Sequence, residues 1–262
     1  MRILLFCPTH RLERETINGI HGMIVPEGVA LDTLFTLDNP HGAQSSRNII
    51  YNYQKAERIV KAEKYDYLFT IENDMIVPPD ALVKLLAVDA DIVYGVYCFR
   101  RGKPTINILR ADDTQESYSL SGNLRAWKKV FGKVIDCNGL GFGCTLIKSS
   151  VFDALTLHSD SGHDGDSQMA HEARRLGITQ KADTSILCGH KRPDGTVLWP
   201  TIDGIKEIGK RQPLETRLII ANQSIAYWNE NGGTEIIKAG VPHAVNYEEA
   251  GVFVNAGMAH YA

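Results

Sequence analysis

Tyr-Leu-Phe-Thr-Ile-Glu-Asn-Asp, residues 67 to 74, is the stretch that decides the fold. Its apolar residues stop abruptly at two carboxylates separated by one amide, Glu72-Asn73-Asp74. A short apolar run of this kind predicts a buried strand, and Pro78 and Pro79 after it predict the start of a helix. In open parallel sheets, ligands bind beyond the carboxyl ends of the strands. We therefore expect Glu72 and Asp74 to face a binding crevice.

Similar apolar runs alternate with helical periods on both sides of this stretch. They predict strands at residues 2–7, 30–37, 65–71, 92–99, 144–147 and 184–188, and helices at residues 47–60, 78–86 and 168–176, with a short helix after residue 149. In the first helix, the residues expected to share the apolar face are Ile49, Ile50, Tyr53, Ala56, Ile59 and Val60. The alternation predicts an α/β fold with an open, mostly parallel, twisted sheet and helices on both faces.

The length of the chain predicts one catalytic-size domain with a small addition. The sequence has 262 residues, of which 44% are hydrophobic and 23% charged, which is ordinary for a globular protein. Apolar periodicity weakens after Trp199. We expect a core domain of residues 1–199 and a C-terminal extension of residues 200–262 that packs on it.

The composition argues against several classes of protein. A net charge of -3 provides no general basic field for nucleic acid. No segment reaches the roughly 18 apolar residues of a membrane span, and the first residues enter a strand, so we expect a cytoplasmic protein. The five cysteines contain no C-x-x-C pair, which favours buried free thiols over a disulfide frame or a zinc site.

The acidic segment has two interpretations on its own residues. Two carboxylates at positions i and i+2 after a strand project hard oxygen ligands, which Mg²⁺ or Mn²⁺ can bridge to a diphosphate. The alternative is an acidic loop that caps the following helix. Residue types alone leave both open.

The order of motifs narrows the choice. The chain carries Ser-Ser-Arg-Asn at 45–48, acid-x-acid at 72–74, Pro-Pro-Asp-Ala-Leu at 78–82, a Gly-rich segment at 139–143 and Cys-Gly-His at 188–190. Over about residues 2–191 this order resembles the GT-A glycosyltransferases of the family 2 kind, especially the compact versions encoded by bacteriophages. The resemblance implies a metal-dependent enzyme that moves a sugar from a nucleotide-sugar donor to an acceptor hydroxyl. UDP is the commonest donor nucleotide in that group.

The resemblance also implies a metal site. Asp74 matches the second acid of the family's D-x-D motif, which is the direct metal ligand. His190 matches the histidine after the last core strand that supplies a further ligand in many relatives, although it can instead be a loop histidine packed on the sheet. Glu72 stands where Asp is more frequent, so it contacts the metal, the sugar or a bridging water. A neutral imidazole ligand favours Mn²⁺ over Mg²⁺.

The donor is expected at several loops. Pro8-Thr9-His10 matches a nucleobase-binding loop, and Arg47-Asn48 matches a pair that faces the nucleotide, where a guanidinium can neutralise diphosphate. A strand stop and a solvated helix end are the structural alternatives. Glycines at 139–143 allow close backbone approach to the sugar, or form a strained turn. The complete set is Pro8, Thr9, His10, Arg47, Asn48, Glu72, Asn73, Gly141, Phe142 and Gly143.

The resemblance places the catalytic base near the start of a predicted helix. The family's Glu-Asp pair aligns with Gly165-Asp166, so its Glu is missing and Asp166 is the candidate that deprotonates the acceptor. Asp164 is the second candidate. An ordinary helix-capping carboxylate is the alternative.

The acceptor is the least defined part of the prediction. Trp127 lies in a polar segment, residues 111–132, and can stack on an acceptor or fill a groove beside the sheet. Basic residues can contact the phosphates of a modified DNA base, and a glycan is the other acceptor considered. They are Arg100, Arg101, Lys103, Lys128 and Lys129.

Two other functions compete. A sugar-phosphate nucleotidyltransferase shares the sheet but usually carries a Gly-rich, Arg-Lys signature after its first strand, which residues 8–13 lack. A non-catalytic nucleotide- or carbohydrate-binding module would explain the missing Glu at Gly165 and the Glu in place of Asp at position 72.

Overall fold

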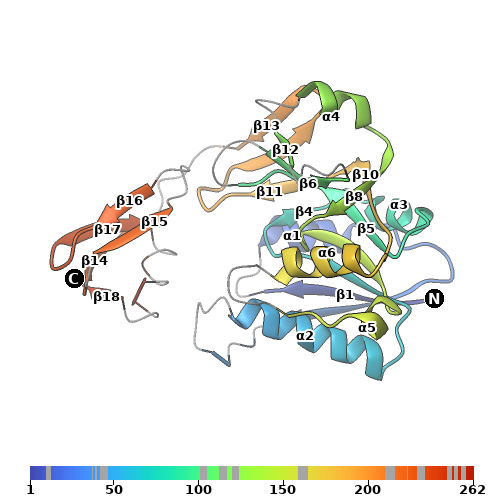
Figure 1. The fold of residues 1–262 in the computed structure, drawn as a ribbon, viewed down its shortest axis with the longest axis horizontal. Helices are drawn as coiled ribbons and strands as arrows, with labels where there is room; N and C mark the ends of the chain where they lie inside the picture. Colours follow the sequence, from blue (N-terminus) through green and yellow to red (C-terminus); the bar gives the residue numbers. More distant parts are fainter. Residues whose placement is uncertain are drawn as a thin grey trace.

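A large mixed sheet organises the chain (Figure 1). The computed structural model describes residues 1–9, 13–36, 38, 40–41, 47–100, 105–111, 117–119, 124–158, 165–209, 216–222, 224–228, 234–246, 250, 253–254 and 258–262. Within these residues the central sheet has nine strands in the order β2-β1-β3-β9-β5-β10-β8-β6-β7. The strands are β1 (Arg2–Pro8), β2 (Ala30–Thr36), β3 (Tyr67–Ile71), β5 (Ile92–Val96), β6 (Thr105–Arg110), β7 (Ser117–Ser119), β8 (Val134–Gly139), β9 (Cys144–Lys148) and β10 (Gln180–Leu187).

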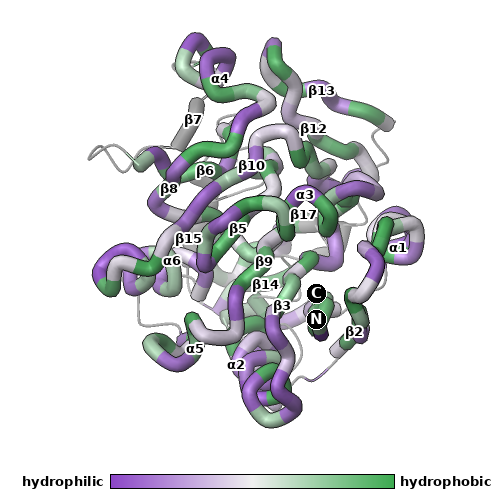
Figure 2. Tube along the Cα trace, turned by 90° about the vertical axis from the view of Figure 1, so that its right-hand side faces the viewer, coloured by the Kyte–Doolittle hydropathy of each residue, from purple (hydrophilic) through white to green (hydrophobic). Residues whose placement is uncertain are grey.

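Most strands of this sheet run in one direction. β1 is parallel to β2 and β3, and β5 is parallel to β10. β9 runs antiparallel between β3 and β5, and β8 and β7 are also reversed. The predicted open, mostly parallel sheet is therefore confirmed, with antiparallel strands inserted. Figure 2 shows hydrophobic residues concentrated in central strands such as β9 and hydrophilic residues along helices such as α2 and α6.

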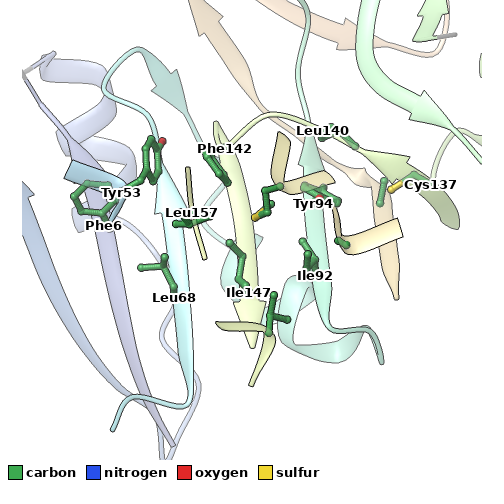
Figure 3. Close-up of a cluster of buried hydrophobic side chains, with 14 of the residues drawn as sticks. Phe6, Tyr53, Leu68, Ile92, Tyr94, Cys137, Leu140, Phe142, Ile147 and Leu157 are labelled. Carbon is green, nitrogen blue, oxygen red and sulfur yellow. The ribbon is translucent and has the colours of Figure 1, made fainter. Parts of the chain in front are cut away.

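Helices cover both faces of the sheet, as predicted. They are α1 (Arg14–His21), α2 (Arg47–Ala62), α3 (Ala81–Ala87), α4 (Leu124–Val130), α5 (Val151–Ala154) and α6 (Gly165–Arg175). Successive residues of a strand point to opposite faces. In β1, Leu4 and Phe6 join a buried cluster with α2, α5 and α6, whereas Leu5 and Cys7 join a second cluster with α1 and α3. Figure 3 shows the first cluster, in which Tyr53 of α2 lies against Phe6.

The buried face of α2 agrees with the prediction at Tyr53, Ala56 and Val60 but not at Ile49. Ile49 is 56% exposed, whereas Asn48, Asn52 and Glu57 are buried beside Tyr53. These polar side chains are satisfied where they lie, since Asn52 accepts a hydrogen bond from the Thr36 hydroxyl at 2.8 Å and Glu57 accepts one from the Leu157 amide at 2.9 Å. Hydrophobic periodicity cannot detect a buried face that carries amides and a carboxylate.

A second, smaller sheet adjoins the carboxyl end of β3. It contains β4 (Met75–Ile76), β11 (Gly189–Lys191), β12 (Val197–Thr201) and β13 (Gly204–Ile208), in the order β13-β12-β11-β4. The domain boundary expected between residues 199 and 200 falls inside β12, which pairs with β13 along its whole length. We propose that the C-terminal extension begins after β13.

The extension forms its own sheets and core. β14 (Thr216–Ala221) pairs with β17 (Pro242–Asn246) and β18 (Ala259–Tyr261), and β15 (Ile225–Trp228) pairs with β16 (Thr234–Ile237). In Figure 1 these strands lie to one side of the large sheet. Their buried residues form a separate cluster of Ile219, Ala221, Ile237, Val245, Ala250, Phe253 and Ala259.

The cysteines agree with the expectation of buried free thiols. Cys7, Cys98, Cys137, Cys144 and Cys188 are all buried free thiols. Among the described residues, no helix combines the length and the apolar character that crossing a membrane would require.

Asp91 links three central strands, β5, β10 and β9, through polar contacts at their ends. Its Oδ2 accepts hydrogen bonds from the Thr179 amide at 3.0 Å and the Thr179 hydroxyl at 2.6 Å, just before β10. Its Oδ1 lies 3.3 Å from the Lys148 ammonium at the end of β9. The Thr179 hydroxyl is the main cause that lowers the pKa of Asp91. Because the folded pKa is the lower one, the carboxylate stabilises the fold above its ordinary pKa, and this stabilisation is lost as pH falls through the folded value.

We therefore expect Asp91→Asn to lower the free energy of unfolding at pH 7 by about 1 kcal/mol, after allowance for partial solvent screening, which lowers the melting temperature by roughly 2 to 4 °C. The difference from the wild type should shrink as the pH falls below 4. Asp89→Asn is the matched control, because the fully exposed Asp89 lies 3.9 Å from the same ammonium and should leave the melting temperature unchanged. Equal melting curves for Asp91→Asn and wild type at pH 7 would contradict the stabilising role.

Candidate functional site

The acidic segment forms a turn at the carboxyl end of β3. The register of β1 on β3 pairs Phe6 with Thr70, so Pro8 and Thr9 end beside Glu72. The Glu72 amide donates to the Gly143 carbonyl at 3.3 Å, and the Met75 amide donates to the Glu72 carbonyl at 3.0 Å. These bonds fix the turn at the sheet edge where the sequence predicts a ligand crevice.

Strand pairing brings His190 to Asp74. β11 pairs with β4 so that His190 lies opposite Met75, and the Lys191 amide donates to the Asp74 carbonyl at 2.8 Å. His190 Nε2 lies 3.4 Å from Asp74 Oδ2. His190 Nδ1 lies 2.7 Å from the Cys98 carbonyl, which can only accept, so the ring proton is on Nδ1. Nε2 therefore donates to Asp74 when the imidazole is protonated, and carries a lone pair that a cation can use when the imidazole is neutral.

Asp74 has one paired oxygen and one unpaired oxygen. Oδ2 also contacts Arg100 Nη1 at 2.5 Å, whereas Oδ1 is buried without a hydrogen-bond partner. Burial by itself would raise the pKa of Asp74, but the His190 hydrogen bond and the charges of His190 and Arg100 hold that pKa at about 2. Asp74 is therefore an ionised carboxylate with a buried oxygen available to a ligand. A buried carboxylate oxygen without a partner is costly, and a cation is the kind of group that would satisfy it.

The pKa of Glu72 is shifted in the opposite direction from that of Asp74. Burial, followed by the negative charges of Asp74 and Asp166, raises the pKa of Glu72 to about 8. Burial and the neighbouring negative charges therefore favour the protonated form of Glu72. A positive charge beside Asp74 would favour its ionised form.

The glycine loop brings Asp166 into the same cluster. A β-carbon built on Gly141 would lie 2.3 Å from the Tyr97 hydroxyl oxygen and 2.7 Å from Asp166 Oδ2. A β-carbon on Gly143 would lie 2.6 Å from the Tyr97 ring. Only glycine fits at either position without a shift of these groups, so the backbone packs directly against Tyr97 and Asp166. Phe142 between them is buried against Tyr53, so its side chain belongs to the core.

Tyr97 is the residue that the sequence did not single out. Its hydroxyl oxygen accepts a hydrogen bond from the Gly143 amide at 3.3 Å, and its ring packs edge to face on His190 with centroids 5.4 Å apart. It thus touches both the histidine and the glycine loop. In the sequence Tyr97 is one more apolar residue of a predicted strand, and no local signal separates it from Tyr94, which lies in the core.

Several residues predicted to bind the donor form hydrogen bonds within the protein. The buried Thr9 hydroxyl donates to the Cys7 carbonyl at 3.0 Å. The buried Asn48 accepts a hydrogen bond from the His41 amide at 3.1 Å. The Asn73 carbonyl accepts one from the Thr16 hydroxyl at 2.8 Å, and Arg47 is exposed at the start of α2. His10, Arg101, Lys103 and Asp164 lie outside the described residues.

Trp127 lies in the core. Its side chain is 0% exposed, its indole N–H donates to the Thr201 carbonyl at 2.8 Å, and its ring packs on Phe131. Trp127 therefore fits the second of the two predicted roles, in which its ring fills a groove beside the sheet. A ring buried in this way cannot stack on an acceptor.

Trp127→Phe should destabilise the fold without changing the site. The substitution removes the hydrogen bond to Thr201 and leaves a void, which should cost about 1 to 3 kcal/mol and lower the melting temperature by roughly 3 to 10 °C. Nucleotide binding by the folded protein should remain at the wild-type level. An unchanged melting temperature combined with weaker ligand binding would show instead that the ring serves a ligand.

The residues present fit a divalent cation that binds together with a nucleotide. Within the described part of the chain, no three His, Cys, Asp or Glu side chains converge on one point. Asp74 and His190 supply a pair, with a free carboxylate oxygen and an imidazole lone pair. Nucleotide sites often hold a divalent cation by one or two protein ligands, with phosphate oxygens and water completing the shell. The pair suits such a site better than a closed, all-protein metal site.

Comparison with known proteins gives a fold likeness. No protein-family model matches the chain, and no curated protein sequence does. The crystal structure of A197 from STIV aligns with a TM-score of 0.51 and 18% identity, over 81% of this chain and 94% of that chain. GalNAc-T7 with UDP, GalNAc and Mn²⁺ aligns with a TM-score of 0.48 and 10% identity, over 72% of this chain and 43% of that one. The catalytic domain of Drosophila β1,4-galactosyltransferase 7 with xylobiose aligns with a TM-score of 0.41 and 13% identity, over 94% of both chains. The last two are too distant to support an argument, and the first shows a shared fold.

Proposed function

We propose that this chain is a metal-dependent glycosyltransferase of the GT-A type, which moves a sugar from a nucleotide-sugar, with UDP the first candidate nucleotide, to an acceptor hydroxyl. The observation that carries the proposal is the pairing of Asp74 with His190 at the carboxyl end of β3, with the unpartnered Asp74 Oδ1 buried between the strands. The resemblance in motif order supports the same conclusion independently.

Asp74 and His190 Nε2 would hold the cation, with Glu72 close to it. Bound there, Mn²⁺ or Mg²⁺ would supply positive charge that stabilises the leaving diphosphate. The chain's own part is to keep Asp74 ionised and to hold the His190 proton on Nδ1, through the Cys98 carbonyl. Gly141 and Gly143 let the backbone lie directly against Tyr97 and Asp166, which holds both side chains beside the acidic turn.

Asp166 is the proposed general base. Its carboxylate would accept the proton of the acceptor hydroxyl while that oxygen forms a bond to the anomeric carbon. The bond between the anomeric carbon and the phosphate oxygen breaks in the same step, and the nucleoside diphosphate leaves. A single displacement of this kind inverts the anomeric configuration, so we propose an inverting enzyme.

Two of the basic residues considered as DNA contacts are paired with carboxylates. Arg100 pairs with Asp74, and Lys128 pairs with Asp203 at 2.6 Å. A guanidinium and an ammonium engaged by carboxylates are less available to phosphates of DNA. The glycan is therefore the acceptor class to test first.

Slow hydrolysis of the donor tests the proposal without knowledge of the acceptor. The protein is incubated with UDP-glucose, UDP-galactose, UDP-GlcNAc or GDP-mannose and Mn²⁺, and release of the nucleoside diphosphate is measured by chromatography. We expect one donor to be hydrolysed, and EDTA to stop the reaction. A donor that raises the melting temperature yet stays intact would favour the binding-module alternative. Absence of both effects with every donor would overturn the proposed function.

A further inference from the structure

Arg100 enters the site from the hairpin between β5 and β6. The neck of this hairpin is fixed, because the Phe99 amide donates to the Thr105 carbonyl at 3.0 Å and Cys98 bridges Ile106. Arg100 is the next residue after this neck, and its guanidinium reaches Asp74. Its side chain is 31% exposed and that of Asp74 is 16% exposed. The backbone position is therefore held, while the long side chain reaches the solvent side of the site.

The guanidinium lies where the site has an excess of negative charge. Its positive charge lowers the pKa of both Glu72 and Asp74. It contacts the same Asp74 oxygen that His190 Nε2 faces. A divalent cation held between Asp74 and His190 would lie next to this guanidinium, and two positive groups at contact distance in a partly buried site repel strongly. Cation and guanidinium are thus competitors for one carboxylate.

The donor diphosphate is a suitable new partner for a displaced guanidinium. The diphosphate of the donor would lie next to a cation on Asp74, within reach of a side chain anchored at the neck. Planar N–H donors match phosphate oxygens well, and the exchange replaces one charged hydrogen bond with another. In the absence of diphosphate, displacement costs the guanidinium its ion pair with Asp74.

We propose that Arg100 is a positioning residue that neutralises Asp74 in the metal-free protein and moves to the donor diphosphate when the cation binds, so that cation and nucleotide bind cooperatively. This inference rests on the proposed function. It makes the cation weakly bound alone and tightly bound with the nucleotide, as expected when two ligands share a coupling free energy.

The test measures Mn²⁺ affinity by isothermal titration calorimetry, with and without saturating UDP, in wild type, Arg100→Gln and Arg100→Lys. UDP should tighten Mn²⁺ binding to wild type. Arg100→Gln should bind Mn²⁺ alone about tenfold or more tightly than wild type, since a charge-assisted competitor is gone. The factor by which UDP increases the Mn²⁺ affinity should be smaller in this variant than in wild type, by a similar amount. Arg100→Lys keeps a positive charge, so its affinity for Mn²⁺ alone should stay closer to wild type. Lys128→Gln, which removes a paired cation at Asp203, is the matched control and should behave as wild type.

The outcomes separate this inference from the function on which it rests. Equal affinity of wild type and Arg100→Gln for Mn²⁺ alone, with binding that requires Asp74, would overturn the role of Arg100 and leave the metal site standing. The role of Arg100 would also be overturned if wild type bound UDP tightly without Mn²⁺ and Arg100→Gln did not. Arg100 would then replace the cation. No Mn²⁺ binding to either protein, with or without UDP, would overturn the metal site itself. Melting curves in EDTA establish that each variant is folded.

Discussion

Replacing Asp74 with Asn should abolish Mn²⁺-dependent stabilisation by the nucleotide. A ligand present at a hundred times its dissociation constant adds about 2.7 kcal/mol to the free energy of unfolding, which should raise the wild-type melting temperature by roughly 5 to 10 °C. Asn keeps the shape of the side chain but removes the negative charge that draws the cation to Oδ1 and to His190. Donor hydrolysis should fall by roughly a thousandfold, because metal stabilisation of the leaving group is worth several kcal/mol.

The measurement is thermal unfolding with UDP, GDP, CDP and TDP, each with Mn²⁺ and with EDTA. Asp80→Asn is the matched control, since Asp80 is a half-exposed carboxylate a few residues away that pairs with Lys84 at 2.9 Å. It should keep the full nucleotide shift. A Mn²⁺-dependent shift that survives in Asp74→Asn would place the nucleotide elsewhere in the chain. No shift in the folded wild type would mean that the acidic turn is structural.

The large sheet was predictable because its central strands have local sequence signals. Short apolar runs such as the one before Glu72 identify buried strands without any knowledge of their neighbours, and the alternation with helices restricts them to an α/β sheet. In α2 the same reasoning missed that Asn48, Asn52 and Glu57 are buried and that Ile49 is exposed. A polar buried face depends on partners such as Thr36 and the Leu157 amide, which lie far away in the sequence.

The metal pair was predictable by resemblance, but its geometry was not. His190 meets Asp74 through β4, a two-residue strand whose pairing with β11 has no sequence signature. The tautomer of His190 depends on the Cys98 carbonyl, and the charge of Asp74 depends partly on Arg100. Each of these contacts joins segments that are far apart in the chain. Tyr97 and the buried position of Trp127 were hidden for the same reason, because an aromatic residue in the sequence does not indicate whether it faces a site or the core.

Asp166→Asn should lower the kcat of Mn²⁺-dependent donor hydrolysis by about 10²- to 10⁴-fold, the range typical of a lost general base. Nucleotide binding should persist, which distinguishes this variant from Asp74→Asn. The substitution is nearly isosteric, and the Asn carbonyl can still accept the hydrogen bond that Asp166 Oδ1 receives from the Ser167 amide at 2.7 Å. The start of α6 and the contact with Gly141 should therefore be preserved, and the loss should appear in kcat rather than in the melting temperature.

Asp153→Asn provides the control, because Asp153 is an exposed carboxylate in the first turn of another helix, α5, and should leave kcat unchanged. Full hydrolysis by Asp166→Asn would transfer the proposed role to Asp164 or to a mechanism without a base at this position. A retaining enzyme forms the product with the donor's anomeric configuration, so the configuration of the released sugar, read by NMR before it mutarotates, decides between these two. Inversion together with full activity would select Asp164, since the single displacement would still need a carboxylate near Gly141. Retention would remove the reason for assigning a base at all, and the proximity of Asp166 to Glu72 would then reflect the need to hold negative charge beside the cation.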